Sequence, residues 1–163
     1  METVNQTQHH DNNGDLYTVQ QNGQMTAPCR TRPSLLHPKQ SCYIGAWNVR
    51  TINETGKAAQ IEREINKYYI QILSISESIW TGNGVITTNS RNTIIYPGRE
   101  DNDDREGVTI VMTPTAKKSL IEWEPINVRL ITARLNGRYA KTSIIVCYAP
   151  TNDAEEEQKD TFY

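Results

Sequence analysis

The chain of 163 residues has room for one domain, and its formal net charge of −2 excludes recruitment to nucleic acid by bulk positive charge. Its three cysteines are too few and too widely spaced for a disulfide framework or a zinc motif. The sequence shows no apolar signal-peptide core and no apolar run long enough for a membrane span, so we expect a nuclear or cytoplasmic protein that is neither secreted nor membrane-bound.

Residues 1–41 form a polar stretch that is rich in Gln, Asn, Thr, His and Pro and poor in aliphatic side chains. A segment of this composition buries too little apolar surface to offset its loss of chain entropy. The sequence therefore predicts a disordered polar tail over residues 1–41, followed by a folded region over residues 42–163.

The pattern changes at Cys42, where apolar and aromatic residues begin to recur. Cys42–Asn48 (CYIGAWN) predicts a buried strand, and Ile70–Ser76 (IQILSIS) predicts another. Between them, Lys57–Tyr69 carries apolar side chains at the helical period. Together these segments predict a strand–helix–strand unit.

The remainder of the chain is rich in strand signals. Asn136-Gly137 is the strongest hairpin signal, and a helix is expected over Asn152–Tyr163 with Asn152 or Asp153 as its N-cap. The pattern predicts an α+β fold in which two sheets stack face to face with helices outside. The further strands that we expect are Val85–Thr88, Thr93–Tyr96, Gly107–Met112, Leu120–Trp123, Val128–Leu135 and Thr142–Tyr148.

Three polar residues stand at the ends of apolar strands, namely Asn48, Glu77 and Tyr148. Strand ends at one edge of a sheet share a rim where functional groups collect, and a carboxylate there can hold Mg²⁺. Each residue taken alone also has an ordinary structural interpretation. Glu77 could be a solvated strand end, Asn48 a turn residue and Tyr148 a packed aromatic.

Four short motifs in order distinguish these interpretations. Together they resemble the endonuclease/exonuclease/phosphatase superfamily, and more closely the apurinic-type endonucleases of non-LTR retrotransposons with their craniofacial development protein-like descendants. The resemblance runs through residues 42–163. The motifs are Trp47–Arg50 (WNVR), Ser76–Trp80 (SESIW), Gly107–Val111 (GVTIV) and Cys147–Asn152 (CYAPTN).

The resemblance implies a four-layer α/β sandwich, with two stacked mixed sheets flanked by helices, that hydrolyses DNA phosphodiesters with Mg²⁺ or Mn²⁺. It implies that Glu77 is the metal ligand, that Asn48 orients the site and that Tyr148 hydrogen-bonds the scissile phosphate. The nucleic-acid-binding residues that it implies on the DNA phosphate backbone are Arg50, Thr151 and Asn152. It implies no stable protein partner.

Two departures from the family pattern separate this chain from an intact enzyme. Arg50 occupies a position where some members carry an Asp, and neither a Gly-Asp-Phe-Asn segment nor a terminal Ser-Asp-His is present. We therefore expect only the N-terminal half of the domain, incomplete in fold and inactive as a nuclease. The alternatives are a non-catalytic gene fragment, or a phosphatase of the same superfamily.

Overall fold

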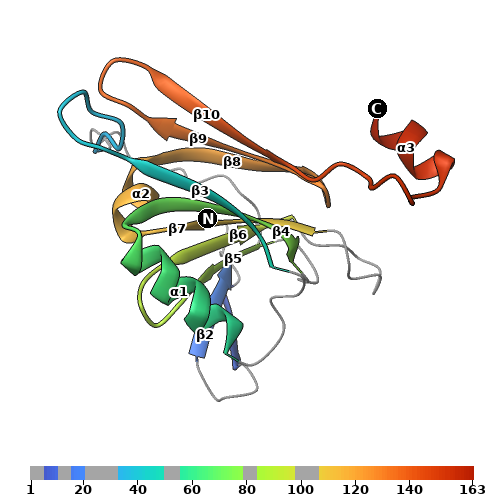
Figure 1. Ribbon diagram of the computed structural model, residues 1–163. Helices are drawn as coiled ribbons and strands as arrows, with labels where there is room; N and C mark the ends of the chain where they lie inside the picture. Colours follow the sequence, from blue (N-terminus) through green and yellow to red (C-terminus); the bar gives the residue numbers. More distant parts are fainter. Residues whose placement is uncertain (1–5, 11–15, 21–32, 50–55, 79–83, 98–106) are drawn as a thin grey trace, which may run out of the picture.

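A computed structural model describes residues 6–10, 16–20, 33–49, 56–78, 84–97 and 107–163 (Figure 1). The described strands form a seven-stranded sheet in the order β1-β2-β5-β6-β7-β4-β3 and a three-stranded sheet in the order β10-β9-β8. The elements in chain order are β1 (Gln6–His10), β2 (Leu16–Gln20), β3 (Tyr43–Asn48), α1 (Lys57–Lys67), β4 (Ile70–Ser78), β5 (Gly84–Thr87), β6 (Thr93–Tyr96), β7 (Gly107–Met112), α2 (Pro114–Ser119), β8 (Leu120–Asn127), β9 (Leu130–Asn136), β10 (Lys141–Cys147) and α3 (Glu156–Phe162).

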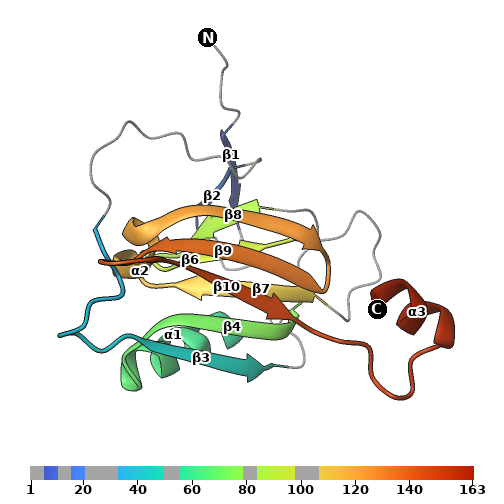
Figure 2. The same ribbon diagram turned by 90° about the horizontal axis from the view of Figure 1, so that it is seen from above.

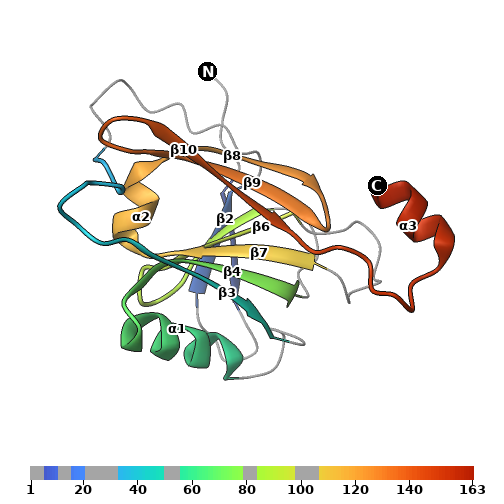
Figure 3. The ribbon, with the colours of Figure 1, turned by 45° about the horizontal axis from the view of Figure 1, so that its top comes forward.

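The two sheets stack face to face, which confirms the predicted α+β sandwich (Figures 1 and 3). The larger sheet is mixed, because β3 and β4 are parallel while its other pairs are antiparallel. The smaller sheet is wholly antiparallel, unlike the mixed sheet that we expected. In the part of the chain that the structure describes, α1 covers the larger sheet and no helix covers the smaller one (Figure 1). We call the face of the larger sheet toward the smaller sheet its inner face, and the face under α1 its outer face.

Two apolar clusters correspond to these two faces. The inner cluster fills the space between the sheets, and the outer cluster lies between the larger sheet and α1. The buried members of the inner cluster are Leu35, Ile72, Ile95, Val108, Ile110, Met112, Ala116, Leu120, Trp123, Ile131, Ala133, Leu135 and Val146. Those of the outer cluster are Ile61, Ile65, Leu73, Ile75, Ile86, Ile94, Tyr96 and Val111.

The predicted strand–helix–strand unit is confirmed as β3–α1–β4. Ile61 and Ile65 lie one helical turn apart on α1 and are both buried, at 5% and 2% exposure, because they face the outer cluster. The helix ends at Lys67, and Tyr69, with a φ of 54°, leads the chain back into β4. Since the crossover returns over one face of the sheet, β3 and β4 run parallel and their carboxyl ends lie at the same rim.

Helix α2 was not predicted, although its start carries a recognisable signal. The side chain of Thr113 accepts a hydrogen bond from the backbone N–H of Ala116, and Pro114 occupies the first helical turn. The helix has only six residues, so its periodicity is too short to detect. It links β7 in the larger sheet to β8 in the smaller sheet, at one end of the sandwich (Figure 3).

Part of the expected tail belongs to the fold. Leu35 is 5% exposed and packs in the inner cluster. Its backbone N–H donates to the carbonyl of Asn136, while Arg138 N–H donates to the carbonyl of Leu36. Strands β1 and β2 also fall within residues 1–41 and join the larger sheet through the pair Gln20 and Val85. Residues 35 and 36 therefore lie against the described fold, while the division of the chain at residue 42 stays a prediction.

Three elements in the C-terminal part of the chain differ in their bounds from the predictions, and β8 runs to Asn127 and not to Trp123. Strand β9 begins at Leu130 and not at Val128, because Val128 and Arg129 form the turn from β8. Helix α3 begins at Glu156 with Glu155 as its N-cap, so neither Asn152 nor Asp153 is the cap. None of the helices in the described ranges has the length and apolar character to cross a membrane.

Candidate functional site

Side chains from three strand ends meet at one rim of the sandwich. The amide Nδ2 of Asn48, the last residue of β3, donates to Oε1 of Glu77 at 2.6 Å. The hydroxyl of Tyr148, directly after β10, donates to the same Oε1 at 2.8 Å. The structure thus brings together the three residues that the sequence singled out, from strands in both sheets.

Glu77 lies at a β-bulge that changes the direction of its side chain. Leu73 and Ile75 of β4 pack in the outer cluster, so a regular strand would point Glu77 toward α1 as well. Between Ser76 and Ser78, however, the register with β7 shifts by one residue. Glu77 itself has a φ of 60°, in the left-handed region that non-glycine residues rarely adopt. The bulge therefore turns Glu77 toward the inner side of the sheet, where both of its hydrogen-bond partners lie.

The residues beside the bulge hold it in place. The hydroxyl groups of Ser78 and Thr109 share a hydrogen bond of 2.7 Å, and both side chains are buried. On the opposing strand, a Cβ at Gly107 would lie 2.3 Å from the carbonyl oxygen of Ser78. Glycine is thus required where β7 passes the bulge, because any larger residue would force the two backbones apart.

A fourth residue of the site was missed by the sequence analysis. Arg129, in the turn between β8 and β9, is only 8% exposed and contacts Tyr148. The sequence analysis placed Arg129 near the start of the expected strand Val128–Leu135. The detectable signal was a charged residue between two apolar ones, Val128 and Leu130.

The donor set of the cluster fits a hard divalent cation. Glu77 and Tyr148 are half-buried, while Asn48 is exposed. Both hydrogen bonds to Glu77 end on Oε1, and the second carboxylate oxygen takes part in neither. Mg²⁺ binds proteins through one or two carboxylates and keeps several water ligands, which this arrangement allows. Over the described ranges, no place gathers three or more His, Cys, Asp and Glu side chains. Among Asn48, Glu77 and Tyr148, Glu77 is the one acidic residue.

Three further residues were predicted to contact DNA. Arg50 lies outside the described residues. Thr151 and Asn152 are exposed, and their carbonyls accept bonds from Ala154 N–H at 3.0 Å and from the Lys159 ammonium at 3.0 Å. These bonds shape the segment between β10 and α3, which extends past the site end of the sandwich (Figure 2). Their contact with nucleic acid stays a prediction.

Fold and site together define an α+β sandwich with a carboxylate-centred polar cluster at the rim where strands of both sheets end. The chain is similar to the curated protein craniofacial development protein 2 of Bos taurus, at 35% identity over 77% of this chain. It is also 34% identical to craniofacial development protein 2 of Tragulus javanicus over the same share. The chain spans about a fifth (21%) of the length of each relative. No protein-family model matches the chain, and no solved structure matches it.

Proposed function

We propose that this chain supplies the metal- and phosphate-binding part of a Mg²⁺- or Mn²⁺-dependent DNA endonuclease site. The observation that carries the proposal is the convergence of Asn48 and Tyr148 on one oxygen of Glu77. A carboxylate with one oxygen fixed by two donors is held in a single orientation, and orientation is what a metal ligand of this kind needs.

Each side chain has a distinct part in the proposed chemistry. Glu77 would hold the cation, and Asn48 keeps the carboxylate in place through its amide. The hydroxyl of Tyr148 donates its single proton to Glu77 in the free chain, and it would donate that proton instead to a phosphate oxygen of the bound DNA. A divalent cation at Glu77 would polarise that phosphate and stabilise the leaving oxygen.

The general base is the part that the described residues do not supply. Glu77 would be occupied with the cation, so it cannot also accept the proton of the attacking water. All three histidines of the chain lie at positions 9, 10 and 37, before β3. We therefore propose that residues 1–163 bind the cation and a phosphodiester but do not cleave it.

A binding experiment on the whole chain tests this proposal. We expect Mn²⁺ to broaden the NMR signals of the Asn48 side-chain amide in ¹⁵N-labelled protein. Glu77→Gln should weaken Mn²⁺ binding at least about tenfold, since it keeps the shape of the side chain and removes the charge. Glu124→Gln, an exposed position on β8, is the matched control and should leave Mn²⁺ binding unchanged.

The bound phosphate distinguishes the endonuclease from the phosphatase alternative. Short duplex DNA should tighten Mn²⁺ binding through the site, because two ligands that share contacts increase each other's affinity. A nucleoside monophosphate that tightens Mn²⁺ binding where DNA does not would favour the phosphatase. If Mn²⁺ affects wild type and Glu77→Gln alike, the metal site is not at Glu77, and the proposal fails.

A further inference from the structure

The buried residue Arg129 contacts Tyr148, one of the three residues of the site. Arg129 belongs to the turn between β8 and β9 and is only 8% exposed. Removing a charged group from water has a large energetic cost unless polar groups and π-systems replace the lost hydration. The groups around Arg129 therefore indicate why a charge is kept at this place.

Three contacts join Arg129 to a single residue, Tyr148. The backbone N–H of Tyr148 donates to the carbonyl of Arg129 at 2.9 Å. In return, Nη1 of Arg129 donates to the carbonyl of Tyr148 at 3.3 Å. The guanidinium carbon also lies 5.7 Å from the centre of the Tyr148 ring, within the range of a cation–π interaction. Arg129 thus contacts the amide, the carbonyl and the ring of the same residue.

The turn that carries Arg129 is itself fixed to both sheets. The backbone N–H of Arg129 donates to Oδ1 of Asn127 at 2.9 Å, which closes the turn locally. The next residue back, Val128, accepts a hydrogen bond from the N–H of Val108 in β7 at 3.1 Å. Val108 follows Gly107, which lies against the bulge of Glu77. One turn therefore ties the Tyr148 backbone to the strand that borders Glu77.

From these contacts we infer that Arg129 is a positioning residue that holds the Tyr148 hydroxyl on Glu77. The two hydrogen bonds between Arg129 and the Tyr148 backbone set where the chain leaves β10, and the guanidinium at the ring restricts the rotamer of the Tyr148 side chain. Without them, Tyr148 would follow an irregular segment, because it is the first residue after the strand. Any effect of Arg129 on phosphate binding rests on the proposed function. The hydrogen bond from Tyr148 to Glu77 is observed without it.

The geometry also explains why the residue is arginine. A guanidinium is planar, so it can lie near a ring while an N–H at its edge donates to a carbonyl. Lysine keeps the charge but has a compact ammonium that cannot make both contacts at once. Arg129→Lys is consequently the informative substitution, since it preserves charge and chain length but loses the double contact.

The test uses the whole chain, with neither metal nor DNA, and follows the carboxyl ¹³C signal of Glu77. Wild type and Tyr148→Phe define the two ends of a scale, with the Tyr148 hydrogen bond present or removed. We expect Arg129→Lys and Arg129→Gln to move the Glu77 signal toward the Tyr148→Phe value, with about a fivefold loss of the bonded population. Arg134→Lys on β9, an exposed partner of Glu122 at 3.8 Å, is the matched control and should stay at the wild-type value.

Each outcome decides the inference. A Glu77 signal at the wild-type value in both Arg129 variants would overturn it. Loss of the folded NMR spectrum in Arg129→Lys would also overturn the inference, because Arg129 would then be required for the stability of the fold and not for the position of Tyr148. A shifted signal supports it even if Mn²⁺ never binds at Glu77, so a failure of the proposed function is seen separately.

Discussion

Ser78 and Thr109 share a buried hydroxyl–hydroxyl hydrogen bond of 2.7 Å beside the bulge that holds Glu77. Thr109 lies opposite Ile75 of the outer cluster, so the bond forms on the outer face of the larger sheet. In a regular strand Ser78 would share the inner face with Ile72 and not meet Thr109. The bond therefore exists only because the bulge shifts the alternation of β4 by one residue, and it stabilises the conformation that presents Glu77.

The first prediction concerns this bond. Thr109→Val keeps the volume of the side chain but leaves the Ser78 hydroxyl without its buried partner, so it should destabilise the protein by about 1–3 kcal/mol. The free energy of unfolding from urea denaturation measures the effect. Combining Thr109→Val with Ser78→Ala should recover part of the loss, since no unsatisfied hydroxyl remains. Additive losses in the double variant would show that the bond does not stabilise the bulge.

The second prediction concerns the glycine opposite the bulge. Gly107→Ala would place a Cβ 2.3 Å from the Ser78 carbonyl oxygen, a backbone atom that cannot move aside alone. We expect a loss of about 1–3 kcal/mol in unfolding free energy and a changed amide spectrum at Glu77. Gly45→Ala is the control, because its nearest atoms are side-chain methyl groups at 3.1 and 3.2 Å. Equal costs at the two positions would contradict a special role for Gly107.

The third prediction corrects the extent of the tail. Leu35→Ala should lower the free energy of unfolding by about 2–4 kcal/mol, because it leaves a cavity in the inner cluster. Its half-buried neighbour Leu36 provides the control, and Leu36→Ala should have a smaller effect. In limited proteolysis, trimming from the N-terminus should stop before Leu35. A stable fragment that begins after position 41 would show that the tail does extend that far.

The fourth prediction concerns the open edge of the smaller sheet. Strand β10 is the last strand in its sheet, and Ile145 on it is 66% exposed. An exposed edge strand with apolar side chains pairs readily with other chains, so we expect aggregation that depends on protein concentration. Ile145→Lys should reduce it, as measured by light scattering. Ile144→Lys, one residue earlier, should instead disrupt folding because that side chain packs against the inner cluster.

The fifth prediction concerns catalysis by the chain itself. Residues 1–163 should not nick plasmid DNA with Mg²⁺ or Mn²⁺, since Glu77 is the one carboxylate among Asn48, Glu77 and Tyr148 and the cation would occupy it. Gel electrophoresis of supercoiled plasmid measures the nicking. Cleavage that disappears in Glu77→Gln would contradict the prediction and would place a general base within these residues.

Local patterns were sufficient for most strands and for α1. The alternation and period of apolar side chains predicted β6 and β7 with their observed bounds, and β3, β4, β5 and β10 within one or two residues. Such patterns depend only on neighbours in the sequence, so they can be found without knowledge of the fold. The helix α2 escaped detection because six residues are too few to show a helical period, and β1 and β2 because they lie in a stretch poor in aliphatic side chains.

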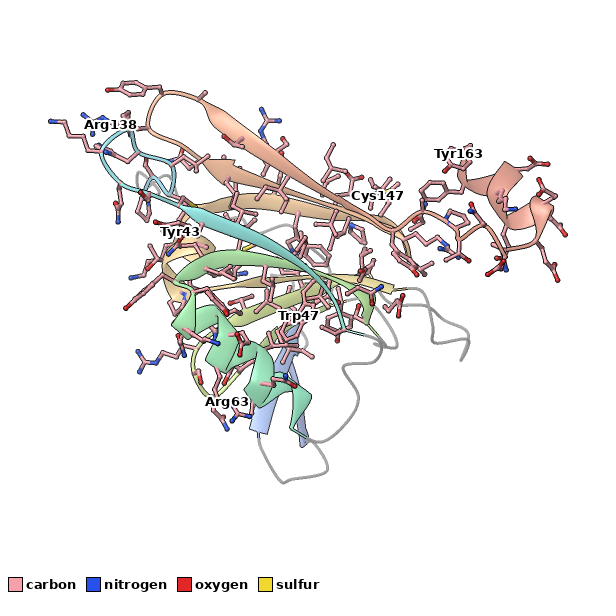
Figure 4. The ribbon with its side chains drawn as sticks, viewed as in Figure 1. Tyr43, Trp47, Arg63, Arg138, Cys147 and Tyr163 are labelled. Carbon is pink, nitrogen blue, oxygen red and sulfur yellow. The ribbon has the colours of Figure 1, made fainter. Side chains whose placement is uncertain are left out.

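Figure 4 shows labelled side chains at the two ends of the sandwich. Trp47 points toward α1, and Cys147, just before Tyr148, lies at the end opposite Arg138. The sequence indicated that polar residues end several strands and predicted a shared rim, but the meeting of Asn48 and Tyr148 on Glu77 could not be derived from local patterns. That depended on the parallel pairing of β3 with β4 and on the stacking of the second sheet.

The sequence by itself determined the strand and helix pattern and the identity of Asn48, Glu77 and Tyr148 as polar residues at strand ends. Only the tertiary structure decided that they touch, since Asn48 lies 29 positions and Tyr148 71 positions from Glu77. It also decided the direction of Glu77 and the burial of Arg129. A bulge and a buried charge are set by register and packing between distant segments, and no local periodicity records them.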